Sequence, residues 1–244
     1  MDSNLYREFY RLGYWKSSFS NSSRLIDELT SMGSLENNEK YFWESKYQRS
    51  EDFRPDVYSF NNEFVNILFE NNIPSMINFL TQRSLKLVHI QLRRVFPGSS
   101  YMDWHRDVHF CNDNVNGTAP AAYKLMFYPM INTENVDTQL KILPGSHNCH
   151  NFFQNKEEML APGLSNFDAS ILNAQPNRIV NVENNNSNFY FFDTSMLHAA
   201  EMSNNSKGAF RLIYLFVTED QYNERYSQKS HHSDLFELYN SRQK

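Results

Sequence analysis

From residue 85 to about residue 217 the chain is a succession of short apolar segments separated by turn residues, and this pattern limits the possible fold most. Residues 87–96 are rich in Leu, Val and Ile, and Pro97 and Gly98 follow them directly. Segments bounded in this way and rich in β-branched or aromatic residues are typical of strands. Further strands are expected at residues 123–130, 139–143, 178–182, 189–192 and 210–217.

Helical patterns lie on both sides of these strands. Apolar residues recur three and four positions apart in residues 24–29, 60–70 and 73–80, and Pro74 is a plausible helix start. Residues 220–227 and 233–239 also have a helical pattern. Helices beside many short strands predict an α+β fold, mainly β, whose β part is a sandwich or jelly roll.

The length of 244 residues and the absence of a linker-like stretch favour a single domain over residues 1–244. We expect a mainly helical bracing region at 1–84, a β core at 85–218 and a helical segment at 219–244. Cys111 and Cys149 are too few for a disulfide framework and form no C-x-x-C pair. A cytoplasmic location fits this cysteine usage best.

The charge pattern narrows the class of partner. The formal net charge is −5, and no long run of Lys and Arg occurs, so nucleic acid is not an expected partner. No stretch approaches the roughly 20 apolar residues of a membrane span. Neither nucleic acid nor a membrane is therefore an expected partner, and the oligomeric state is left open.

The sharpest local motif is Trp104-His105-Arg106-Asp107. Residues i and i+2 of an extended chain point to the same face, so His105 and Asp107 can bind one metal ion together. A satisfied pair on the surface is the alternative. A third ligand is available in His198, which ends the aromatic segment that contains Phe191 and Phe192. Two histidines and one carboxylate suit a non-haem iron(II) oxygenase, because adjacent coordination positions remain open.

Arg211 begins the apolar strand 212–216, where a lone arginine is expected to pair with an anion. Its planar fork is suited to gripping a carboxylate, such as the distal end of 2-oxoglutarate. A structural salt bridge to a nearby acidic residue is the alternative.

Between about residues 87 and 217 the chain resembles the phytanoyl-CoA dioxygenase-like branch of the iron(II)/2-oxoglutarate oxygenases. Besides the motifs above, the resemblance rests on the segment 140–147, which ends in Pro144-Gly145-Ser146-His147, and on Asn205-Ser206 before Arg211. It implies a double-stranded β-helix, a distorted jelly roll similar to the cupins, with helices bracing one sheet.

The resemblance also implies the site and its chemistry. His105, Asp107 and His198 would be the catalytic metal ligands, and Arg211 would hold the 5-carboxylate of 2-oxoglutarate. The cofactors would be Fe(II), 2-oxoglutarate and O2, and the products would include succinate and CO2. The expected partner would be a small-molecule substrate or a carrier-bound metabolite, oxidised at a C–H bond. Halogenating relatives carry a small residue in place of the carboxylate, so Asp107 favours hydroxylation or another oxidation, such as desaturation, over chlorination. A hydroxylase is the expected kind of dioxygenase.

Other polar residues are candidates with plain structural alternatives. On the strand 87–96, Gln91 and Arg94 cannot both point inward because they differ by an odd number, and Arg94 is the preferred cofactor-binding residue. Lys124 could reach a carboxylate of the cosubstrate if it faces inward, although a solvated lysine is the commoner case.

Three more residues are candidate substrate contacts. His109 follows Asp107 by two positions and could line the mouth of the barrel. Trp104 could shield the metal, although core packing explains most buried aromatics. His147 closes the Pro-Gly-Ser-His turn, where it could equally stabilise the turn.

Residues 6–70 and 151–177 are expected to cover the mouth and to set specificity. Two further functions stay open, since the same barrel supports different activities. One is hydroxylation of protein side chains, and the other is a non-catalytic jelly roll that binds a ligand or a partner.

Overall fold

The computed structural model describes residues 3–33, 43–44, 51–54, 61–95, 102–105, 107, 122–129, 140–148, 178–182, 186–200, 209–225 and 230–242. The helices are α1 (Ser3–Leu12), α2 (Ser23–Gly33), α3 (Glu63–Glu70), α4 (Ile73–Thr81), α7 (Glu219–Arg225) and α8 (Ser230–Ser241), with a 3-10 turn η3 (Ser146–Asn148). Each helical pattern predicted from the sequence corresponds to one of these helices.

The strands form two antiparallel sheets. A seven-stranded sheet has the order β1-β9-β6-β11-β4-β3-β2, and a four-stranded sheet has the order β5-β10-β7-β8. Their bounds are β1 (Tyr14–Ser18), β2 (Trp43–Glu44), β3 (Glu51–Arg54), β4 (Leu85–Val95), β5 (Met102–His105), β6 (Ala122–Phe127), β7 (Leu140–Ile142), β8 (Val180–Asn181), β9 (Asn188–Asp193), β10 (His198–Ala200) and β11 (Ala209–Thr218).

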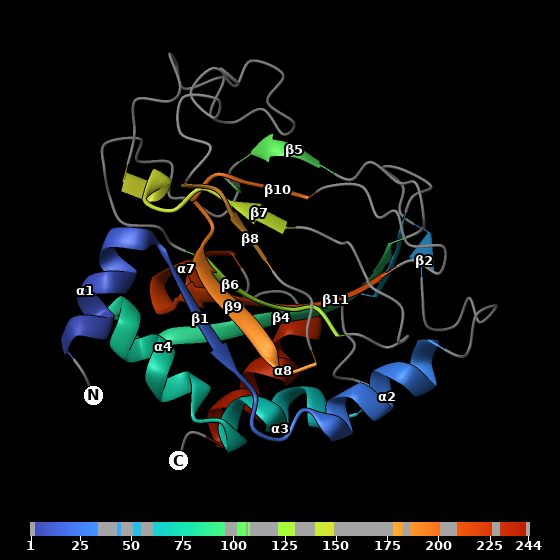
Figure 1. Ribbon diagram of the computed structural model, residues 1–244. Coiled ribbons are helices and arrows are strands. Elements are labelled where there is room, and N and C mark those ends of the chain that lie inside the picture. Colours follow the sequence, from blue (N-terminus) through green and yellow to red (C-terminus); the bar gives the residue numbers. More distant parts are fainter. Residues whose placement is uncertain are drawn as a thin grey trace.

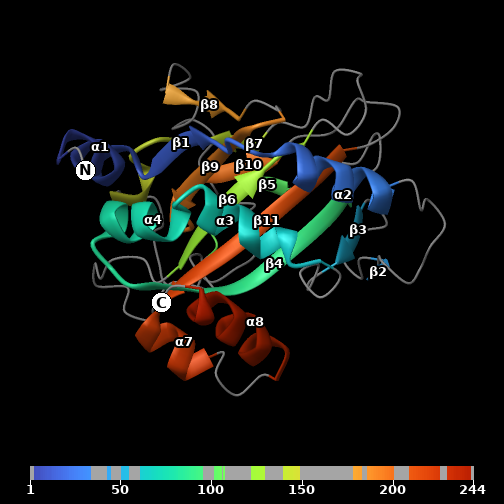
Figure 2. The ribbon, with the colours of Figure 1, turned by 90° about the horizontal axis from the view of Figure 1, so that it is seen from below.

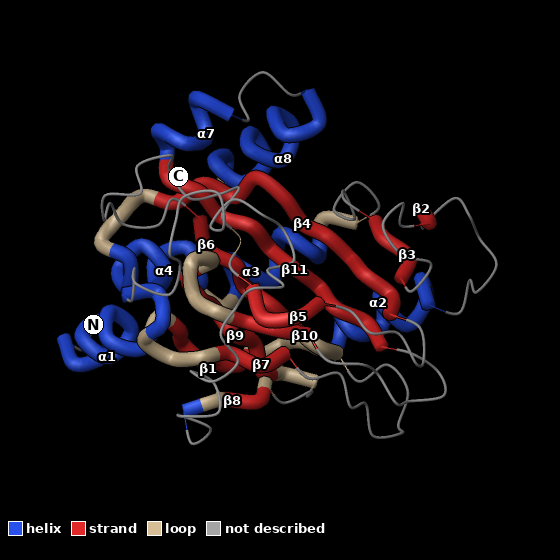
Figure 3. The backbone as a smooth tube through the Cα atoms, turned by 90° about the horizontal axis from the view of Figure 1, so that it is seen from above, coloured by secondary structure: helices blue, strands red, loops and turns tan. Residues whose placement is uncertain are grey.

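Three layers result, with the small sheet above the large one and most helices below it (Figure 1). Seen from below, α2, α3 and α4 extend across the large sheet, while α7 and α8 lie beside β4 (Figure 2). Seen from above, β5, β10 and β7 lie in front of the large sheet (Figure 3). The fold is the predicted double-stranded β-helix with bracing helices.

Alternation along the strands divides the apolar residues between two cores. On β6, Tyr123, Leu125 and Phe127 belong to the core beneath the helices, which we call the helix face. Met126 and Tyr128 belong to the core between the two sheets, which we call the inner face.

The helices cover the face of the large sheet that points away from the small sheet. Leu25 and Leu29 of α2 and Phe64 of α3 are buried in the helix-face core, together with Phe216 of β11. Residues 6–70 were expected to cover the mouth of the barrel. For the described helices in this range the expectation is wrong, because their apolar residues pack against the helix face of the large sheet. Residues 151–177, predicted to cover the mouth as well, lie outside the described residues.

The N-terminal segment also contributes a strand to the large sheet. β1 pairs with β9, with Tyr14 opposite Phe192. Gly13, directly before β1, has a φ of +79°, and a Cβ there would come within 2.8 Å of Cε1 of His147. Glycine is thus required by backbone conformation and by the close approach of η3.

Among the described residues, no helix combines the length and apolar character needed to cross a membrane.

Candidate functional site

Two strands of the small sheet bring the predicted metal ligands together. His105 ends β5 and His198 begins β10, and their Cα atoms are partners in the antiparallel register. Asp107 follows β5, and its backbone N–H donates to the carbonyl oxygen of Thr194 at 3.0 Å. The strand pairing and this hydrogen bond place all three side chains at one point between the sheets.

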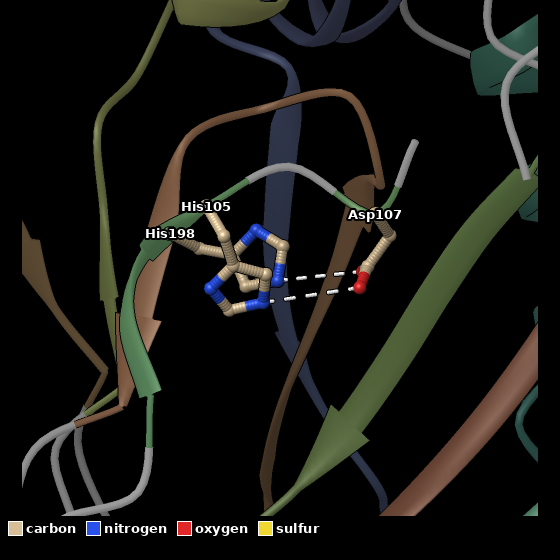
Figure 4. A group of neighbouring side chains, drawn as sticks. All are labelled: His105, Asp107 and His198. Atoms are coloured by element: carbon tan, nitrogen blue, oxygen red, sulfur yellow. Dashed lines mark ion pairs between the residues drawn. The ribbon is translucent and has the colours of Figure 1, made fainter. Parts of the chain in front are cut away.

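The three side chains converge in a geometry that suits one metal ion (Figure 4). Nε2 of His105 lies 3.8 Å from Oδ1 of Asp107, and Nε2 of His198 lies 3.4 Å from Oδ2. One ligand atom from each residue lies within 4.8 Å of the others. In the described part of the chain, this is the one group of three or more His, Cys, Asp or Glu residues with such an arrangement.

Hydrogen bonding prepares His198 as a ligand. Its Nδ1 lies 2.8 Å from the carbonyl oxygen of Met196. A carbonyl can only accept, so Nδ1 carries a proton, and Nε2, which faces Asp107, is the nitrogen whose lone pair would be available to a metal ion once Nε2 is deprotonated. This arrangement fixes both tautomer and ring orientation, as is usual for histidines that bind metals.

Asp107 is buried but remains a carboxylate. Burial by itself raises its pKa, but Lys124, His198 and His105 together hold the pKa well below its usual range. Nζ of Lys124 lies 2.6 Å from Oδ2. Lys124 therefore faces inward, in contrast to the commoner case of a solvated lysine, and its described contact is with a candidate metal ligand.

Arg211 lies on the inner face of β11 and is 2% exposed. Along β11, Phe210 and Leu212 belong to the helix-face core and Ile213 to the inner core, so Arg211 shares the inner face with Ile213. Its positive charge opposes the effect of burial on Tyr128, whose pKa is raised to about 12. A buried guanidinium between the sheets is suited to binding a carboxylate there.

The register places Gln91 and Arg93 on the inner face, while a role of Arg94 in cofactor binding stays a prediction. The Cα of Arg211 is opposite Arg93, while that of Arg94 is opposite Phe210, which belongs to the helix-face core. Residues opposite each other in a sheet share a face, so Arg93 and Gln91 share that of Arg211. The side chain of Arg94 lies outside the described residues.

Gln91 and Arg93 form a polar row on β4. Nη2 of Arg93 donates to Oε1 of Gln91 at 3.1 Å, and Gln91 also hydrogen bonds to His89. The sequence contained a signal for this row, since apolar Val88, Ile90 and Leu92 alternate with it.

The three residues predicted to contact the substrate differ in what the structure shows of their surroundings. Trp104 packs against Leu143 and Leu197, which is a core contact. Nε2 of His147 donates to the carbonyl oxygen of Tyr10 at 3.0 Å, so this ring joins η3 to α1. His109 lies outside the described residues. Roles of all three in substrate binding stay predictions.

Comparison with known proteins supports the fold through structure and not through sequence. No family model matches the sequence, and no curated protein matches it. A solved structure of SnoN, a non-heme alpha ketoglutarate dependent epimerase from nogalamycin biosynthesis, is similar with a TM-score of 0.60 and 14% identity. The similarity covers 88% of this chain and 80% of SnoN.

Two further solved structures have the same fold. EctD from S. alaskensis with bound Fe has a TM-score of 0.62 at 13% identity, over 91% of this chain and 78% of EctD. HygX from Streptomyces hygroscopicus, with nickel and 2-oxoglutarate bound, has a TM-score of 0.64 at 10% identity, over 90% of this chain and 88% of HygX. The chain thus has the fold of these proteins, with a candidate metal centre between its two sheets.

Proposed function

We propose that the chain is a non-haem iron(II)- and 2-oxoglutarate-dependent dioxygenase. The observation that carries this proposal is the cluster of His105, Asp107 and His198, which lies within the same inner layer as the buried Arg211. Two neutral imidazoles and one carboxylate are the donor set of iron(II) oxygenases, and this set fits the geometry. Membership of the phytanoyl-CoA dioxygenase-like branch stays a prediction.

The spacing of the inner face supports a dicarboxylate cosubstrate. Lys124 pairs with Leu215 in the register of β6 and β11, and Arg211 lies four residues along β11 from Leu215. At about 3.3 Å per residue, the backbone positions of Lys124 and Arg211 are about 13 Å apart. Since Lys124 contacts Asp107, a cosubstrate that reaches from the candidate metal centre to Arg211 would extend along this inner face.

Each side chain then has a defined task. His105, Asp107 and His198 would hold iron(II), and Arg211 would hold the 5-carboxylate of 2-oxoglutarate. Bound iron would supply the centre at which O2 and 2-oxoglutarate react to give succinate and CO2 while a C–H bond of the substrate is oxidised. The aromatic ring of Phe192, 5.3 Å from that of His198, would help to exclude water.

The proposed substrate is a small-molecule or carrier-bound metabolite, and hydroxylation is the proposed outcome. Solved structures of similar fold contain nogalamycin RO in SnoN and 5-hydroxyectoine in EctD, both small molecules. The net charge of −5 agrees with a function that does not involve nucleic acid. We also propose a cytoplasmic location, in keeping with only two cysteines.

Release of succinate from 2-oxoglutarate tests the proposal. With iron(II), 2-oxoglutarate and O2, the wild-type protein should form succinate slowly even without substrate, and a substrate found among small metabolites should accelerate this release. Asp107→Ala should abolish it, whereas Lys141→Met, on the outer face of β7, should not. Acceleration by a peptide together with its hydroxylation would favour a protein hydroxylase instead, and absence of all turnover by an iron-loaded protein would contradict the proposal.

A further inference from the structure

Lys124 connects the large sheet to the candidate metal centre on the small sheet. It lies on β6 between Tyr123 and Leu125, which face the helices, so its side chain is on the inner face. Its Nζ is 2.6 Å from Oδ2 of Asp107, and its side chain is 18% exposed. Limited exposure keeps such an ion pair largely unscreened by solvent.

The same strand also fixes the backbone of Asp107. The N–H and the Oγ1 of Thr194 both donate to the carbonyl oxygen of Ala122, at 3.2 and 3.0 Å. The carbonyl oxygen of Thr194 in turn accepts the N–H of Asp107. β6 therefore holds Asp107 at two places, at the backbone through Thr194 and at the carboxylate through Lys124.

Lys124 thus engages Oδ2, while Oδ1 is the carboxylate oxygen that faces Nε2 of His105, at 3.8 Å. We propose that Lys124 is a positioning residue, which holds Oδ2 so that Asp107 meets the metal ion through a single oxygen. This inference rests on the proposed function only in requiring a divalent metal at His105, Asp107 and His198. Single-oxygen ligation leaves open a coordination position that a two-oxygen carboxylate would fill, and cosubstrate and O2 need such positions.

A different role for Lys124 is direct binding of a cosubstrate carboxylate. That role would have no effect on a site that contains the metal alone. The positioning role acts on the metal alone, because the contact with Asp107 exists without any cosubstrate. The two roles are therefore separated by an experiment without 2-oxoglutarate.

The experiment loads the purified protein with Mn(II) and counts metal-bound water by electron paramagnetic resonance in water enriched in oxygen-17. Lys124→Met should bind fewer water molecules than the wild type, because the released carboxylate can bind through both oxygens. Lys124→Arg, which keeps charge and donors, should give the wild-type count. Lys141→Met is a matched control on the neighbouring sheet, where it alternates with buried Leu140 and Ile142.

An unchanged water count in folded, Mn(II)-loaded Lys124→Met would overturn the positioning role. Weaker binding of 2-oxoglutarate by that variant would then assign Lys124 to the cosubstrate and leave the proposed function intact. Failure of the wild type to bind Mn(II) at the three ligands would instead contradict the proposed function.

The wild-type protein provides a second test that does not depend on the folding of a variant. Infrared difference spectra of the protein with and without Mn(II) report the antisymmetric and symmetric stretches of the ligand carboxylate. A wide separation of the two bands, as for single-oxygen ligation, is expected. A narrow separation, as for two-oxygen ligation, would overturn the proposal.

Discussion

At the level of single residues, Asp107 combines burial with neighbours that favour its ionised form. Burial raises its pKa, but Lys124, His198 and His105 lower it further than burial raises it. The folded-state pKa is thus below the unfolded value of about 3.9. The ionised carboxylate therefore stabilises the fold fully above that pH, and this contribution is lost as the pH falls through the folded-state pKa.

Asp107→Asn should therefore destabilise the metal-free protein in a pH-dependent way. At pH 7 we expect a loss of about 3 kcal/mol, because Lys124 is left without its partner carboxylate in a largely buried site. The difference in the free energy of unfolding between Asp107→Asn and the wild type should become smaller as the pH falls below about 4. Urea unfolding over this pH range measures it, and a difference that does not change with pH would contradict the assigned pKa direction.

The site residues that the sequence revealed were those with a local signal. His105 and Asp107 share a face of an extended chain, and Arg211 is a charge in an apolar strand. Arg93 was missed because the alternation along residues 88–93 shows that Gln91 and Arg93 share a face but does not show which face that is. Only the pairing with β11 shows which residues of β4 share the face of Arg211.

At the level of elements, the close approach of Gly13 and His147 joins α1, β1 and η3. Gly13→Ala should destabilise the protein by about 2 kcal/mol, since alanine disfavours the positive φ and its Cβ meets the His147 ring. In a His147→Ala background the same change should cost less, because only the backbone strain remains. Equal costs in both backgrounds, measured by chemical denaturation, would show that the ring contact is unimportant.

Neighbouring phenylalanines of β9 separate the two faces of the large sheet. Phe191 stacks on Phe9 and Tyr123 beneath the helices, while Phe192 contacts the ring of His198. Both are fully buried, so replacement of either by Leu should cost about 1 kcal/mol or more.

Only Phe192→Leu should weaken Mn(II) binding, severalfold, because it loosens the orientation of His198. Isothermal titration of the two variants compares them directly. If Phe191→Leu weakened Mn(II) binding as much as Phe192→Leu does, the specific role of Phe192 in orienting His198 would be contradicted.

Elements with a strong internal pattern were predictable, and elements that depend on pairing were not. The predicted strand at 210–217 corresponds to β11, and the predicted helix at 73–80 to α4. β10 has three residues and β5 has four, which is too short for a periodic signal. β1 was missed for a similar reason, since its five residues are organised by pairing with β9.

At the level of the whole molecule, the proposed ligands connect the two sheets. The metal ligands lie at the small sheet, whereas Arg211 and Lys124 belong to the large one. Ligands that bind only the folded state stabilise it by mass action, by about 2.7 kcal/mol at a hundredfold excess over Kd. A metal ion at this excess should raise the Tm by about 5 to 10 °C in a chain of this size.

2-Oxoglutarate should raise the Tm further, but only when the metal is present, because one end of the molecule requires the metal. Arg211→Met should retain the increment from the metal and lose most of that from 2-oxoglutarate. Thermal unfolding followed by circular dichroism measures both increments. If 2-oxoglutarate raised the Tm equally without the metal, its binding site would lie away from the candidate metal centre.

Anaerobic titration of the purified protein with iron(II) and then 2-oxoglutarate tests the central claim most directly. We predict a weak visible charge-transfer band from the iron chelate, which His198→Ala abolishes and Arg211→Ala weakens. Absence of the band in a wild-type protein whose folding and iron loading have been confirmed would contradict an iron(II)/2-oxoglutarate centre. That result would leave the double-stranded β-helix in place with a different function.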